Sequence, residues 1–97
     1  MKTITIKGTG SALPERQMEN EELTNLVDTS DAWIRERTGI ARRHIAEEET
    51  VVSLAAKAAL SALEQAGKNP TEVELILLAT CSPEYLLPCS ACQVQEC

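Results

Sequence analysis

The sequence predicts an α/β fold, and three segments support this prediction. Residues 2–8 alternate between polar and β-branched side chains, as a half-buried strand does. Residues 51–66 are good helix formers and are apolar over most of the helix circumference, so neighbouring elements must cover that helix. Residues 73–80 contain a continuous apolar run, which favours a central strand buried on both faces. Strand, helices and buried strand in this order predict a crossover in a mixed or parallel sheet.

Glycine and proline residues end the first predicted strand. The run Gly8-Thr9-Gly10 stops it, and Pro14 fixes the loop that follows. The two glycines resemble the start of a dinucleotide-binding fingerprint, but the third glycine is absent and Pro14 stands where the helix would begin. That site is therefore excluded. Asn20 is then expected to cap a short helix with an apolar face in residues 23–27.

A second short helix is expected between Ser30, a good N-cap, and Gly39, a good helix stop. On this helix Trp33, the only tryptophan, shares a face with Arg37. Ile34 points away from that face and can anchor the helix in a core. An exposed indole with a guanidinium one turn away suits a flat, negatively charged ligand. The alternative is a core tryptophan and a solvated arginine, and the spacing alone favours this alternative.

The middle of the chain is expected to contain a short strand and then the long helix. Residues 41–45 read as extended, and His44, the sole histidine, is interpreted as a surface or hydrogen-bonded residue. Thr50 is a plausible N-cap for the helix 51–66, which Gly67 and Pro70 end.

The formal net charge of −6 argues against a nucleic-acid partner. The only basic stretch suits a phosphorylated small molecule or an acidic protein, or it pairs with neighbouring carboxylates. No apolar run is long enough to span a membrane, and no hydrophobic leader follows the first residues, so a cytoplasmic location is expected. The basic stretch consists of Arg35, Arg37, Arg42, Arg43 and His44.

The cysteines gather near the end of the chain and permit three interpretations. A structural zinc site would use all four thiolates, but the spacing lacks two paired C-x-x-C knuckles. A redox C-x-x-C places its first cysteine before a helix, as Cys89 does here. The composition favours the third interpretation, reduced and partly buried thiols in a cytosolic protein. The cysteines are Cys81, Cys89, Cys92 and Cys97.

Several motifs, in order and without large gaps, resemble the opening segment of a β-ketoacyl–acyl carrier protein synthase III. The match extends over nearly the whole chain. It is carried by Gly8 to Glu15, Asn20, Val27 to Asp31, Trp33-Ile34, Arg37 to Ile40, Leu78-Ala79-Thr80 and Pro88 to Gln95.

This resemblance implies a thiolase-type fold, of which residues 1–97 form an incomplete N-terminal part. The part is expected to hold the first two core strands of a mixed sheet with covering helices. The implied enzyme is an acyltransferase that condenses acyl-coenzyme A with malonyl–acyl carrier protein and so initiates fatty-acid synthesis, through a cysteine thioester. The family's catalytic cysteine, histidine and asparagine lie beyond this segment, so the isolated chain is expected to be inactive. Cys92 matches an upstream, non-catalytic cysteine.

The resemblance also implies binding residues and partners. Trp33 and Arg37 match the residues that hold the adenine end of coenzyme A. Thr29 matches a residue that contacts the ligand at the mouth of the same binding site. Leu87 matches a position, usually phenylalanine, that crosses the family's dimer interface to line the partner's acyl pocket. Acyl-coenzyme A, acyl carrier protein and a second copy are the implied partners. Coenzyme A enters as a substrate thioester, and no cofactor or metal is implied.

Two alternatives from other classes remain open at this point. One is a free-standing module that binds coenzyme A without catalysis. The other is a structural module that associates with itself through an exposed apolar helix and an open strand edge.

Overall fold

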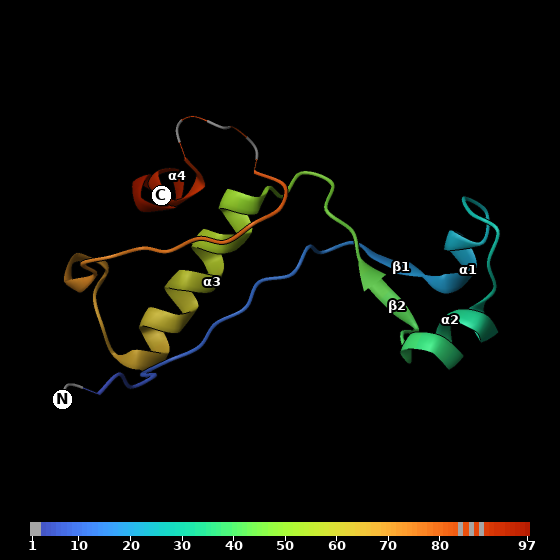
Figure 1. Ribbon diagram of the computed structural model, residues 1–97, viewed down its shortest axis with the longest axis horizontal. Coiled ribbons are helices and arrows are strands. Elements are labelled where there is room, and N and C mark those ends of the chain that lie inside the picture. Colours follow the sequence, from blue (N-terminus) through green and yellow to red (C-terminus); the bar gives the residue numbers. More distant parts are fainter. Residues whose placement is uncertain (1–2, 84, 86, 88) are drawn as a thin grey trace. The chain divides into compact units, whose positions relative to one another are not determined.

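The computed structural model describes residues 3–83, 85, 87 and 89–97. These residues divide into two compact units (Figure 1). The helical unit consists of the N-terminal segment through Ala12 together with Glu49–Cys97. The strand-pair unit consists of Leu13–Glu48.

The strand-pair unit is built on two short antiparallel strands, β1 (Gln17–Glu19) and β2 (Arg42–His44). Gln17 lies opposite His44, and Glu19 lies opposite Arg42. Strand β2 confirms the extended segment expected at residues 41–45. Strand β1 was not predicted, because its residues lack the β-branched alternation that marks a strand.

Two helices, α1 (Asn20–Leu23) and α2 (Asp31–Thr38), complete this unit. The expected cap at Asn20 is wrong: Glu19 occupies the N-cap position, and Asn20 is the first helical residue. Asn20 is only 1% exposed, because its side chain is directed to α2 rather than to its own helix. Helix α1 ends at Leu23, so Leu26 and Val27 do not extend its apolar face and are exposed.

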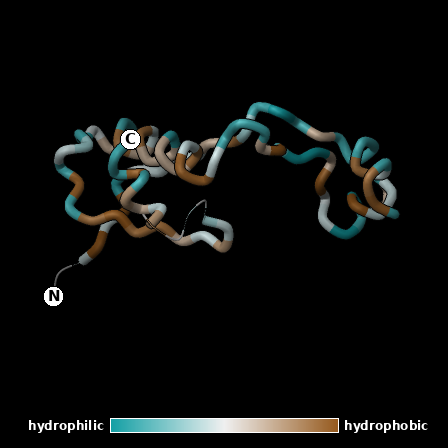
Figure 2. Tube along the Cα trace, turned by 90° about the horizontal axis from the view of Figure 1, so that it is seen from above, coloured by the Kyte–Doolittle hydropathy of each residue, from teal (hydrophilic) through white to brown (hydrophobic). Residues whose placement is uncertain are grey.

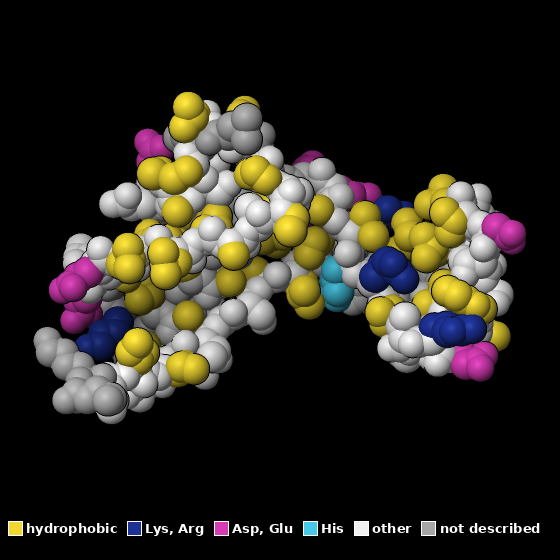
Figure 3. Space-filling model, viewed as in Figure 1, with side chains coloured by type: hydrophobic (Ala, Val, Ile, Leu, Met, Phe, Trp, Pro, Cys, Tyr) yellow, Lys and Arg dark blue, Asp and Glu magenta, His cyan; other side chains and the backbone are white. Residues whose placement is uncertain are grey.

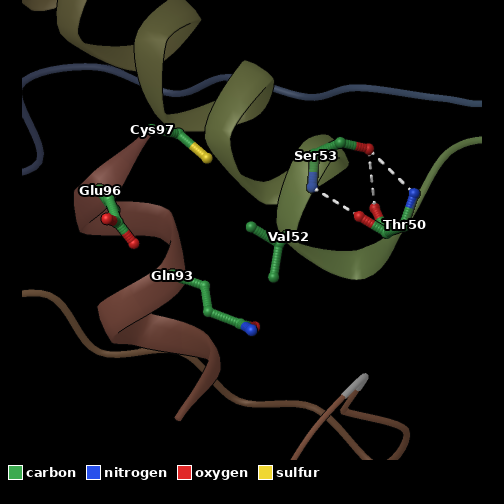
Figure 4. Close-up of a pocket in the computed structure, with 6 residues that line it drawn as sticks. All are labelled: Thr50, Val52, Ser53, Gln93, Glu96 and Cys97. Atoms are coloured by element: carbon green, nitrogen blue, oxygen red, sulfur yellow. Dashed lines mark hydrogen bonds between the residues drawn. The ribbon is translucent and has the colours of Figure 1, made fainter. Parts of the chain in front are cut away.

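The helical unit is organised around the long helix α3 (Val51–Ala66), whose bounds agree with the prediction. Thr50 caps it in a reciprocal arrangement: Thr50 Oγ1 accepts from the Ser53 N–H at 3.1 Å, and Ser53 Oγ accepts from the Thr50 N–H at 2.9 Å (Figure 4). Gly67 ends the helix in the left-handed conformation, with φ of 67°.

Two shorter elements follow α3 in the helical unit. A 3₁₀ turn, η1 (Pro70–Glu72), comes first, and the C-terminal helix α4 (Ser90–Glu96) packs against α3. Helix α4 confirms that a helix follows Cys89, as the sequence predicts.

The N-terminal segment lies directly against α3. A Cβ added at Gly8 would come within 2.5 Å of the Ala62 carbonyl oxygen, and the Thr9 N–H donates to Gln65 Oε1 at 2.6 Å. The glycines thus permit a close approach of backbone to helix that larger residues would prevent. Figure 1 shows this segment running along α3 in an extended trace.

The strands expected at residues 2–8 and 73–80 do not form within the part of the chain that the structure describes. Neither described segment pairs with another strand, and the sheet there is the antiparallel pair β1–β2 rather than a mixed sheet. A strand needs a neighbouring backbone to bond its N–H and C=O groups, and neither segment has one among the described residues.

Apolar side chains of these two segments remain exposed. Figure 2 shows hydrophobic residues next to the N terminus, and Figure 3 shows hydrophobic side chains over the visible face of the helical unit. The exposed side chains include those of Ile4, Ile6, Leu75 and Leu77.

No helix among the described residues combines the length and the apolar character needed to cross a bilayer.

Candidate functional site

Helix α2 carries the predicted binding residues, and local sequence signals set its bounds. Ser30 Oγ accepts a hydrogen bond from the Trp33 N–H at 3.2 Å, which makes Ser30 the N-cap. Gly39 ends the helix with φ of 73°, a left-handed conformation that favours glycine. Both predicted ends of this helix are therefore confirmed.

The two faces of α2 have different environments. Ile34 is 4% exposed and anchors the helix in the core of the strand-pair unit, where Met18 is also buried. Trp33, one residue earlier, is 54% exposed. Successive helical residues are about 100° apart, so burying Ile34 leaves the neighbouring face free. The interpretation of Trp33 as a core residue is wrong.

Trp33 and Arg37 contact each other on the exposed face. The guanidinium carbon of Arg37 lies 5.6 Å from the centroid of the Trp33 ring, within cation–π range. The spacing of four residues brings the two side chains onto one face, as predicted. Together they present an aromatic surface and a positive charge to solvent.

Two other cations of the basic stretch form ion pairs with carboxylates. Arg35 Nε donates to both Asp31 oxygens, at 2.8 and 2.9 Å, and Arg42 forms an ion pair with Glu19 at 3.5 Å. Arg37 has no carboxylate partner among residues 3–83, 85, 87 and 89–97. Pairing therefore accounts for part of the basic stretch and leaves the charge of Arg37 available. Figure 3 shows arginine side chains beside hydrophobic ones on the visible face of this unit.

The Asp31–Arg35 pair stabilises the charged state of both side chains. The hydrogen bond from Arg35, followed by that from Asn20, lowers the pKa of the Asp31 carboxyl below its ordinary value. The same bond from the other side raises the pKa of Arg35. Asp31 also stands in the first turn of α2, where a carboxylate is favourable to the helix dipole.

Asn20 connects α1 to both ends of α2. Its Nδ2 donates to Asp31 Oδ1 at 2.9 Å and to the Ile40 carbonyl oxygen at 2.7 Å. The Asn20 N–H also donates to the Ala41 carbonyl oxygen at 3.2 Å. This positioning role was missed in the sequence, because contacts between residues eleven and twenty positions apart give no local pattern.

Thr29 lies immediately before the N-cap of α2 and is half-buried. Its Oγ1 is buried and has no hydrogen-bond partner within the described part of the chain. A buried hydroxyl in this state lacks the hydrogen bond that such groups usually make. Thr29 lies one residue before the N-cap Ser30, near the start of the helix that carries Trp33.

Two other predicted residues lie away from α2 in the sequence. Leu87 belongs to the helical unit and is 86% exposed. His44 Nδ1 lies 2.6 Å from the Pro14 carbonyl oxygen, so the imidazole donates from Nδ1. The prediction of a hydrogen-bonded histidine is confirmed.

The helical unit contains a shallow hollow of about 410 Å³ where α4 meets the start of α3 (Figure 4). Gln93 and Val52 project toward it from the two helices. The Gln93 Oε1 atom is buried and has no hydrogen-bond partner among the residues described. The hollow contains none of the binding residues predicted from the sequence. Its lining consists of Thr50, Val52, Ser53, Gln93, Glu96 and Cys97.

The four cysteines are free and exposed, so the expectation of partly buried thiols is wrong. Within the described residues, no group of three or more His, Cys, Asp or Glu side chains is placed to hold a metal ion.

No family model matches the sequence. Curated proteins do. The chain is 50% identical over 92 residues to β-ketoacyl-[acyl-carrier-protein] synthase III of Brucella anthropi. The aligned region covers 94% of this chain and 28% of that protein. It is 52% identical over 96 residues to the protein of that name from Rhizorhabdus wittichii, covering 98% of this chain and 30% of the relative.

Solved structures agree with these relatives. The 3-oxoacyl-[acyl-carrier-protein] synthase III of Aquifex aeolicus VF5 matches with a TM-score of 0.90 and 48% identity, over 94% of this chain and 30% of that one. The priming β-ketosynthase of the R1128 polyketide pathway matches with a TM-score of 0.89 and 34% identity, over 94% of this chain and 28% of the other.

Fold and sequence together show that the chain is similar to one segment of proteins with the thiolase-type fold. Within that class, the chain is homologous to a segment of the β-ketoacyl-[acyl-carrier-protein] synthase III proteins. It spans between 28% and 30% of the length of these two curated relatives. The predicted α/β class is confirmed, although the strands expected in it are not paired among the described residues.

Proposed function

We propose that this chain supplies part of the coenzyme A-binding site of a β-ketoacyl–acyl carrier protein synthase III. The whole enzyme would condense an acyl-coenzyme A with malonyl–acyl carrier protein and so begin fatty-acid synthesis. The observation that carries the proposal is the exposed Trp33 ring with the Arg37 guanidinium 5.6 Å from its centroid. The homology over nearly the whole chain supports the same role.

The two side chains would divide the work of binding between them. The Trp33 ring offers a flat apolar face on which an adenine base can stack, and Arg37 supplies the charge that a phosphate requires. Thr29, at the start of the same helix, would donate a hydrogen bond to the ligand from its unpartnered hydroxyl. Holding α2 through Asn20 and Ile34 keeps this surface in place before the ligand arrives, which reduces the ordering cost of binding.

Fluorescence titration of the 97-residue chain with coenzyme A tests the proposal directly. Trp33 is the only tryptophan, so intrinsic emission reports on this one ring. We expect saturable quenching by coenzyme A. Replacing Arg37 by alanine should weaken the apparent affinity about tenfold, the equivalent of about 1.4 kcal/mol. Free N-acetyl-tryptophanamide, titrated in parallel, corrects for light absorbed by the adenine.

Arg43→Ala is the matched control, because it removes the same charge from strand β2 instead of α2. The control should retain the wild-type affinity within about twofold, well short of the tenfold that corresponds to 1.4 kcal/mol. Equal losses in both variants would indicate general charge attraction and contradict the pairing of Trp33 with Arg37. Quenching that stays linear up to millimolar coenzyme A would contradict binding by this chain.

The exposed apolar segments favour a second proposal, self-association. Ile4, Ile6, Leu75 and Leu77 stand on segments whose backbone makes no strand pair among the described residues. Extended segments with unpaired backbone N–H and C=O groups can pair with a strand of another chain, as the edge strand of a sheet does. Native mass spectrometry of the purified chain would show a dimer or larger assembly. A strictly monomeric chain across the micromolar range would contradict this proposal.

The remaining assignments are part of the same proposal. Residues 1–97 would form an incomplete N-terminal part of a thiolase-like domain, and the whole enzyme would act in the cytoplasm with acyl carrier protein as a partner. Leu87, 86% exposed, would reach a second copy and border its acyl pocket. The leucine there leaves more space than a phenylalanine ring and would change the preferred acyl length.

A further inference from the structure

Two thiols meet at the start of helix α4. Cys89 is the N-cap residue, with extended backbone angles of −65° and 153°, and Cys92 is three residues farther along. Their sulfur atoms are 3.1 Å apart. Such a contact brings the two atoms of a disulfide near each other before any oxidation.

The same geometry occurs at the start of α3, with different chemistry. There the N-cap Thr50 and the third residue Ser53 exchange two hydrogen bonds in a capping box (Figure 4). An N-cap residue in extended conformation directs its side chain over the first turn, toward the third helical residue. In α4 two cysteines occupy these positions, and the N-cap side chain makes no capping bond to the backbone. The Cys89 sulfur is therefore turned toward a second sulfur.

The two thiols differ in their readiness to react. The hydrogen bond between the two sulfur atoms lowers the pKa of the Cys89 thiol and raises the pKa of the Cys92 thiol. Because the thiolate is the nucleophile in thiol–disulfide exchange, Cys89 attacks first and Cys92 resolves the intermediate. Both side chains are exposed, so small reagents reach them.

We propose that Cys89 and Cys92 form a reversible dithiol–disulfide pair, which a low-molecular-weight disulfide such as oxidised glutathione converts to the disulfide and a low-molecular-weight thiol such as reduced glutathione converts back to the dithiol. This redox modification site is independent of coenzyme A binding by α2. It would act on the first turn of α4, the helix that packs against α3.

The exchange takes place in two balanced steps. The Cys89 thiolate attacks one sulfur of oxidised glutathione, forming a mixed disulfide and releasing one glutathione thiolate, which takes up a proton. The Cys92 thiol loses its proton and attacks the Cys89 sulfur, expelling the second glutathione. The protein dithiol is thus oxidised by two electrons, and one glutathione disulfide is reduced to two thiols.

Peptide mass mapping after oxidation tests the pair. The 97-residue chain is incubated with oxidised glutathione, blocked with iodoacetamide and cleaved after glutamate. Cleavage after Glu84 and Glu96 yields the peptide 85–96, which contains Cys89 and Cys92 and neither of the other two cysteines. We expect this peptide to escape alkylation and to be lighter than its reduced form by two hydrogen atoms, and dithiothreitol to reverse the change.

Three variants and one condition decide the outcome. Cys92→Ser should trap Cys89 as its glutathione mixed disulfide, Cys89→Ser should abolish the internal disulfide, and Cys81→Ser should leave it unchanged. In urea the preference for this pair should fall severalfold. Equal glutathionylation of all four cysteines, a disulfide that joins Cys97 or Cys81 instead, or an unchanged preference in urea would overturn the proposal.

Discussion

The side-chain amide of Asn20 donates a hydrogen bond to the Asp31 carboxylate at 2.9 Å, across eleven residues of the chain. The same nitrogen donates to the Ile40 carbonyl oxygen at 2.7 Å, beyond the other end of α2. One buried amide thus holds the start and the end of the helix that presents Trp33 and Arg37. The stability of the candidate site depends on this residue, although Asn20 belongs to a different helix.

Replacing Asn20 by alanine should destabilise the strand-pair unit. The change removes both hydrogen bonds and leaves the Ile40 carbonyl oxygen without this donor, at a cost of about 1–3 kcal/mol in the free energy of unfolding. Urea unfolding followed by Trp33 fluorescence measures the effect, since Trp33 lies on the helix that Asn20 holds.

The control is Asn25→Ala, which removes an amide of the same kind from an exposed position. It should change the free energy of unfolding by no more than about 0.5 kcal/mol. Asn20→Asp should destabilise further than the alanine variant at neutral pH, because it sets a second carboxylate beside Asp31. An Asn20→Ala variant as stable as the wild type would contradict the role of the amide.

Acid should weaken α2 through Asp31. The pKa of this carboxyl is lowered in the folded state, first by Arg35 and then by Asn20, so the ionised form binds these partners more strongly than the protonated form. Its contribution to stability is present above the ordinary aspartate pKa and is lost as the pH falls through the lowered, folded-state pKa. Urea unfolding at a series of pH values, from neutral to below that range, measures the loss.

Asp31→Asn identifies the part of the pH dependence that belongs to this group. The variant should be less stable at neutral pH and should lose less stability on acidification than the wild type. Because the pair is exposed, added salt should reduce the difference between the two proteins. Parallel pH curves for wild type and variant would show that Asp31 does not contribute.

Helices α2 and α3 could be predicted closely because their ends depend on local residues. Thr50 and Gly67 set the bounds of α3, and Ser30 and Gly39 set those of α2, each through bonds or backbone angles within one turn. The strands expected at residues 2–8 and 73–80 could not be judged in the same way. The alternation in residues 2–8 describes which faces a strand would bury, but a strand also requires a partner backbone.

The candidate site was predicted in part for the same reason. The four-residue spacing of Trp33 and Arg37 fixes their shared face, and the observed ring contact follows from it. Spacing does not show whether that face is buried, because burial depends on where Ile34 packs. The role of Asn20 depends on contacts with Asp31 and Ile40, which no periodicity in the sequence records.

Gly10 is expected to tolerate no larger residue, because backbone atoms of α3 occupy the space where its side chain would be. A Cβ at this position would overlap the Ala58 carbonyl oxygen and come within 2.7 Å of the Ala62 nitrogen. Gly10→Ala should therefore push the N-terminal segment from α3, at a cost of about 1–3 kcal/mol. Hydrogen exchange should speed up at the Thr9 amide, which donates to Gln65 in the wild type. Lys7→Ala, an exposed neighbour, is the control, and unchanged Thr9 exchange in Gly10→Ala would show that this close approach does not hold the segment.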